Sequence, residues 1–121
     1  MNSDEQFVRE HWQHVHYADT ALSVLAGPHY VIIGGYSYGP LKFAAYRHTA
    51  AEAWQAAREF TEMRLEEIRQ TEEEIDVIRE GITLAEENEE DNKRYGNPFR
   101  RILADEQAAL AALKQGMKEK Q

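Results

Sequence analysis

Three histidines near the amino-terminal end, His11, His14 and His16, have the residue type and spacing of metal ligands. Imidazoles at this spacing can hold zinc if a helix ends near the second of them. A tetrahedral zinc site needs further ligands, and the chain has no cysteine and no second histidine cluster. We therefore expect no metal and no other cofactor, and we expect these histidines to face solvent at a helix end.

Carboxylates are the second group that could do chemistry. The runs 72–74 and 86–91 are almost wholly acidic, and paired carboxylates can serve as acid and base or as metal ligands. Di-iron helical bundles use a Glu-x-x-His motif, and this chain has none. Side chains in such runs point around a helix and mostly into water. We therefore expect a solvated helix face and no enzyme activity.

A glycine-bounded loop, residues 34–40, reads Gly-Gly-Tyr-Ser-Tyr-Gly-Pro and is called the tyrosine loop below. It lacks the Gly-Lys-Ser/Thr ending of a phosphate-binding loop, and strands rather than a strand and a helix flank it. Tyrosines contribute a large contact area at a small entropy cost, so Tyr36 and Tyr38 are candidate anchors for a partner protein. The alternative is an ordinary hairpin loop whose tyrosines pack on the sheet edge.

One long helix is predicted over residues 49–93. Thr49 and Glu52 fit a capping box, in which the Thr49 hydroxyl accepts from the Glu52 amide and the Glu52 carboxylate accepts from the Thr49 amide. Gly81 interrupts strong helix formers and indicates a bend or a close approach. Two rows at a spacing of seven give the seam of a coiled coil, namely Thr61, Ile68, Ile75 and Ile82, and Arg64, Thr71, Ile78 and Ala85.

The residues before this helix, 1–48, read as a small cap. Ser3 and Gln6 suggest a capping box for a short helix. Aromatic and β-branched residues between glycine-rich turns indicate three strands, which form an antiparallel meander with helices on one face. The expected ranges are about 4–13 for the helix and 15–25, 29–34 and 41–46 for the strands.

The residues after the long helix turn back. Gly96, Asn97 and Pro98 are suited to ending one helix and starting the next, so a returning helix is expected over residues 98–118. The expected fold is therefore α+β. It has a short helix and a three-stranded antiparallel sheet packed on the long helix, then an antiparallel, coiled-coil-like helical hairpin. All of residues 1–121 would form a single domain.

The acidic charge is concentrated on the long helix. The net charge is -8, and 15 of the 22 acidic residues lie between Glu52 and Asp91, against four arginines. Such a surface repels a phosphate backbone, so direct nucleic-acid binding is not expected. It would instead attract a basic groove in another protein. No apolar run approaches the about 20 residues of a membrane span, and Met1–Glu5 does not resemble a secretory signal.

Two segments carry a resemblance to small hypothetical proteins of phages and prophages. They are Phe7-Val8-Arg9-Glu10-His11-Trp12 and Ala51-Glu52-Ala53-Trp54-Gln55-Ala56-Ala57, with a tyrosine-rich hairpin between them. The resemblance covers about the first half of the chain. Small acidic phage proteins include inhibitors of bacterial defence, among them anti-CRISPR proteins of diverse folds. The resemblance therefore implies a protein-binding inhibitor in the host cytoplasm and assigns no residue roles.

Together these features predict an inhibitor that binds a nucleic-acid-handling protein, such as a Cas effector. Its acidic helix would occupy a basic channel that normally holds phosphate backbone, and the tyrosine loop would add an anchor. The alternative is a structural or assembly protein that self-associates as a homodimer through the heptad seam. The residues expected to bind the partner are Glu66, Glu67, Glu73, Glu74, Asp76, Tyr36 and Tyr38.

Overall fold

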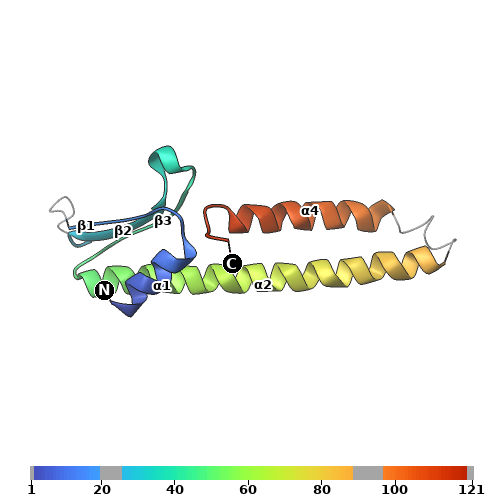
Figure 1. Cartoon of the computed structure of the whole chain (residues 1–121), viewed down its shortest axis with the longest axis horizontal. Helices are drawn as coiled ribbons and strands as arrows, with labels where there is room; N and C mark the ends of the chain where they lie inside the picture. The colour runs from blue at the N-terminus through green and yellow to red at the C-terminus, as the bar shows by residue number, and fades with distance from the viewer. Residues whose placement is uncertain (1, 20–25, 89–96, 120–121) are drawn as a thin grey trace. The chain divides into compact units, whose positions relative to one another are not determined.

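Figure 1 shows the computed structural model of the chain, which describes residues 2–19, 26–88 and 97–119. The fold is α+β, as predicted, and these residues form three α-helices and one three-stranded antiparallel sheet. They group into two compact units, Met1–Met63 with Gly116–Gln121, and Arg64–Gln115. The long helix α2, Ala50–Glu87, contributes residues to both units.

The first unit contains a short helix and the sheet. The strands lie in the order β1-β2-β3 and each pairs antiparallel with the next, which confirms the predicted meander. The third range predicted as a strand matches within one residue, whereas residues 20–25 of the first range lie outside the described residues. The elements are α1 Ser3–His11, β1 Val15–Asp19, β2 His29–Gly34, the short 3-10 helix η1 Tyr36–Tyr38, and β3 Leu41–Arg47.

The cap of α1 differs from the prediction. Asn2, not Ser3, is the N-cap, and its side-chain oxygen accepts a hydrogen bond of 2.8 Å from the Glu5 amide. Asparagine caps a helix as well as serine does, so the earlier residue can take the position and Ser3 enters the first turn. The helix also ends at His11 rather than Gln13.

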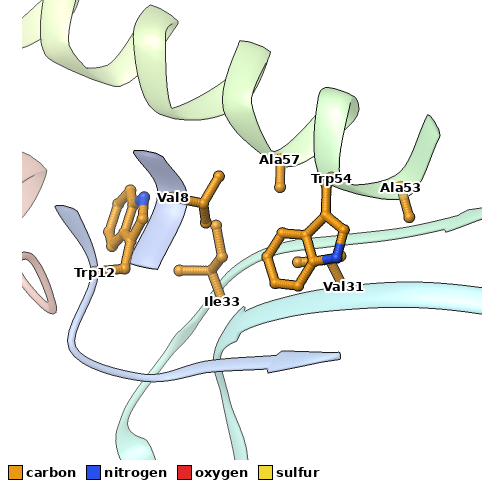
Figure 2. Packing of buried hydrophobic residues seen from close by; sticks show 7 residues of the cluster. All are labelled: Val8, Trp12, Val31, Ile33, Ala53, Trp54 and Ala57. Carbon is orange, nitrogen blue, oxygen red and sulfur yellow. The ribbon is translucent and has the colours of Figure 1, made fainter. Parts of the chain in front are cut away.

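A cluster of buried apolar side chains joins the sheet to both helices of this unit (Figure 2). Val31 and Ile33 alternate with more exposed residues along β2, so both point to the same sheet face. The side chains that meet them there come from α1 and from the first turns of α2. The whole cluster comprises Val8, Trp12, Val31, Ile33, Ala53, Trp54 and Ala57.

One buried polar residue completes this core. Thr61 is fully buried, and its hydroxyl accepts a hydrogen bond of 2.9 Å from the Trp12 indole nitrogen. The same hydroxyl donates to the Ala57 carbonyl at 2.8 Å, so both polar groups are satisfied without water. Thr61 therefore occupies its heptad row for a structural reason: it holds the indole of Trp12, the residue that follows α1, against α2.

The start of α2 confirms half of the predicted capping box. The Glu52 amide donates to the Thr49 hydroxyl oxygen at 3.1 Å, as expected. The Glu52 carboxylate, however, accepts at 2.9 Å from the Thr49 hydroxyl rather than from the Thr49 amide. The two side chains therefore bind one another, and the cap still satisfies one of the free amides in the first turn.

The second unit consists of the later part of α2 and of α4, Asn97–Lys114 (Figure 1). A β-carbon at Gly81 would lie 4.0 Å from the ring of Phe99, near the start of α4, while Arg64 donates to the Leu113 carbonyl at 3.4 Å. These contacts pair late residues of one helix with early residues of the other, so the two helices run antiparallel. Ile68 and Ile75 are buried in this unit. A coiled-coil geometry for the pair stays a prediction.

The end of α4 differs from the predicted range of 98–118. The helix stops at Lys114, and Gly116 adopts a positive φ of 82° that a helix does not allow. The following residues pair in the first unit, where Lys118 donates its amide to the His11 carbonyl at 2.8 Å. This backbone pairing stops the helix before Lys118.

Two other predictions concern the end of the long helix and the number of domains. The long helix was expected to reach residue 93, and residues 89–96 lie outside the described part of the chain. The assignment of residues 1–121 to a single domain stays a prediction. In the described ranges, no helix is long and apolar enough to cross a membrane.

Candidate partner-binding surface

The tyrosine loop projects from the sheet of the first unit. Tyr36 is 87% exposed and Tyr38 is 59% exposed, so neither side chain is absorbed by the core. Tyr38 does have a neighbour, because its ring stacks on His14 with ring centroids 4.1 Å apart. At the base of the loop Gly34 has a φ of 75°, and a β-carbon there would lie 2.6 Å from the Pro40 carbonyl oxygen. Only glycine fits this position.

The three histidines of the expected helix end have separate neighbours. His11 contacts the Phe7 carbonyl through Nδ1 at 2.7 Å, and His16 approaches the Tyr30 hydroxyl at 3.4 Å. His14 instead stacks on the tyrosine loop. Among the residues with described positions, no group of three histidine, aspartate or glutamate side chains could hold a metal ion.

The five carboxylates expected to bind the partner all lie in the second unit and are exposed on α2. Arg69 forms ion pairs with two of them, Glu66 and Glu73. Its hydrogen bonds to Glu66 hold the pKa of that carboxyl below its usual value. Glu67 and Asp76 take part in no ion pair between described residues, whereas Glu74 faces a second carboxyl on α4. The predicted tyrosines and carboxylates therefore belong to different units.

The unpredicted feature of the second unit is a shallow groove of about 510 Å³ between α2 and α4. Val77 and Ile78 provide its apolar surface, and Val77 is 68% exposed. The remaining lining residues are polar or acidic: Gln70, Glu73, Glu74 and Glu106. The groove therefore combines an exposed apolar side chain with three carboxyl groups, so it offers a partner both apolar and charged contacts.

Glu74 and Glu106 bring two carboxyl groups together at the rim of this groove. A hydrogen bond with Glu74 is the main cause that raises the pKa of Glu106. Two neighbouring carboxylates repel one another, and a proton held by one of them relieves the repulsion. A cation placed beside the pair would have the same effect. The rim is therefore a place where positive charge is favoured.

The sequence analysis missed Val77, although a signal for it was present. Gln70, Val77 and Leu84 are seven residues apart, so they form a third row on the helix, outside the seam. Val77 and Leu84 are 68% and 60% exposed. Exposed apolar residues two helical turns apart in one row could have drawn attention to this side of the helix.

The chain's own cations neutralise part of the acidic surface. Arg100 pairs with Glu86, and the Lys114 ammonium lies 3.9 Å from Glu72. Residues 64–88 and 97–115, however, contain 11 acidic and six basic side chains, so this unit keeps a net negative charge.

No protein-family model, no curated protein and no solved structure matches the chain.

Proposed function

We propose that the protein is an inhibitor of phage type that binds a nucleic-acid-handling defence protein, such as a Cas effector, in the host cytoplasm. The carboxylates of α2 would occupy a basic groove that otherwise binds phosphate backbone, and Tyr36 and Tyr38 would add a packed anchor. The role needs no enzyme activity and no direct contact with nucleic acid. The resemblance to small acidic phage proteins supports the choice of target class.

The observation that carries this proposal is the surplus of exposed carboxylates on α2. Glu67, Glu74 and Asp76 have no arginine or lysine partner among the described side chains. Their charge is therefore available to a cationic partner, and it acts at a distance of about 8–10 Å at physiological salt. The ion pairs of Arg69 reduce the local charge without reversing its sign.

A competition experiment tests the proposal. A panel of purified Cas effectors would be bound to labelled target DNA, and the chain would be titrated in to displace the DNA. We expect displacement by the unmodified chain, and an at least tenfold higher half-effective concentration for the double variant E73K/E74K. The control E10K/E119K makes the same change in net charge at exposed residues of the first unit. Equal effects of the two double variants would contradict the proposal.

Self-association through the heptad seam is the second candidate function. The exposed side chains Val77 and Leu84 favour self-association of α2, although they lie outside the seam, because exposed apolar residues on a helix can contact a second copy. Ile68 and Ile75 of the seam oppose it, since each is already buried in the single chain. Light scattering distinguishes the two: a stable dimer that dissociates when Ile75 is replaced by a charged residue would favour assembly.

A further inference from the structure

The groove on the second unit has an apolar floor that faces solvent. Val77 and Ile78 come from adjacent positions of α2, and α4 closes the other side with Glu106. Val77 is exposed in the free protein, so covering its side chain would remove apolar surface from water at no cost in existing contacts. The groove is thus suited to an apolar side chain of a partner.

Glutamates flank this apolar row on both sides. In a helix of 3.6 residues per turn, the row of Val77 and Leu84 lies between the rows of Glu73 and Glu74. The row on one side consists of Glu66, Glu73, Glu80 and Glu87, of which the first two are ion-paired with Arg69, and the other contains Glu67 and Glu74. An apolar line between two acidic lines is complementary to a helix with an apolar face and basic flanks.

A second copy of the chain fits this surface less well. In a twofold-symmetric dimer, the same surface of each copy meets its counterpart. Glu73, Glu74 and Glu106 of one copy would then lie near the same carboxyl groups of the other, and like charges at an interface oppose association. Charge complementarity therefore selects a basic occupant.

We propose that this groove binds a basic amphipathic α-helix of the partner protein, with one apolar side chain on Val77 and Ile78 and lysine or arginine side chains at Glu73, Glu74 and Glu106. The inference rests on the proposed function, because it specifies how the basic partner is held. A helix is the fitting form, since Val77 and Leu84 lie two helical turns apart and a partner helix repeats its apolar side chains at that spacing.

The experiment compares two synthetic peptides of leucine and lysine with identical composition. One places its leucines on a single helical face, and the other has a scrambled order. Calorimetric titration into the full chain gives both affinities. We expect the amphipathic peptide to bind at least tenfold more tightly, and V77S to lose about tenfold of that affinity, the value of one buried branched side chain. L41S, which shortens an exposed apolar side chain in β3, is the control and should bind as the unmodified chain does.

Each outcome separates this inference from the proposed function. Preference for the amphipathic peptide that V77S abolishes supports both. Equal binding of the two peptides, or a preference that V77S leaves unchanged, overturns the proposal that the groove binds an amphipathic helix. Either result leaves the proposal of charge-driven binding intact. Binding of neither peptide overturns both. V77S should keep its fold, because serine and valine have similar helix propensities and the valine is exposed. Circular dichroism checks this.

Discussion

At the scale of single residues, Glu106 is informative because its partner has the same charge. Glu74 on α2 shares a hydrogen bond with it, and this contact raises the pKa of Glu106 above the usual 4.5. A carboxyl group whose pKa is raised in the folded state binds more protons there than in the unfolded chain. Its contribution to the free energy of unfolding is therefore largest below 4.5 and is lost as the pH rises through the raised pKa.

Replacing Glu106 with glutamine removes the pH dependence that this carboxyl group gives to the free energy of unfolding. E106Q keeps a group that can donate to Glu74 and removes the charge repulsion, so we expect a higher melting temperature at neutral pH. The advantage over the unmodified chain should shrink as the pH is lowered toward 4.5. Thermal melts followed by circular dichroism measure this advantage, and E67Q, an exposed change on α2, is the control. An advantage that does not depend on pH would refute the shared proton.

At the scale of elements, Gly81 in α2 is a residue whose replacement should stabilise the helix. The sequence indicated a bend or a close approach there, yet a β-carbon at Gly81 would have its nearest neighbour, a ring atom of Phe99, at 4.0 Å. That is ordinary van der Waals contact. The glycine therefore weakens the helix by about 1 kcal/mol relative to alanine with no visible steric requirement.

We expect G81A to raise the free energy of unfolding by about 0.5–1 kcal/mol. Urea titration followed by helical circular dichroism measures this change. The contrasting variant is G116A, because Gly116 has a φ of 82° and alanine there should destabilise the protein. If G81A is instead destabilising, the ring of Phe99 lies closer to position 81 than the 4.0 Å given above.

The elements themselves were largely predictable, because their signals are local. The Thr49 cap and the β-branched run of β2 each act within a few residues. Some helix ends differ from the prediction because two neighbouring residues can cap the helix at similar free energy. Asn2 and Ser3 at the start of α1 are an example. The groove at Val77 was not predictable, since it exists only where α4 lies against α2. The exposed row was visible in the sequence, but the neighbour that turns it into a groove was not.

At the scale of the whole molecule, the proposed partner binding depends on charge and on one apolar row. The chain carries a net charge of -8, and its first unit holds the aromatic core while its second unit holds the carboxylates of the proposed surface. Ion pairs within α2 offset part of that charge, so the remaining field should be strong at low salt and weak at high salt.

The most direct measurement is the affinity for a Cas effector from which the chain displaces DNA in the competition experiment, determined over a series of salt concentrations. We expect the dissociation constant to rise steeply with salt for the unmodified chain and less steeply for the double variant E73Q/E74Q, because fewer charges then meet the basic groove. Binding that does not change with salt, in either protein, would contradict the claim that the carboxylates of α2 hold the partner.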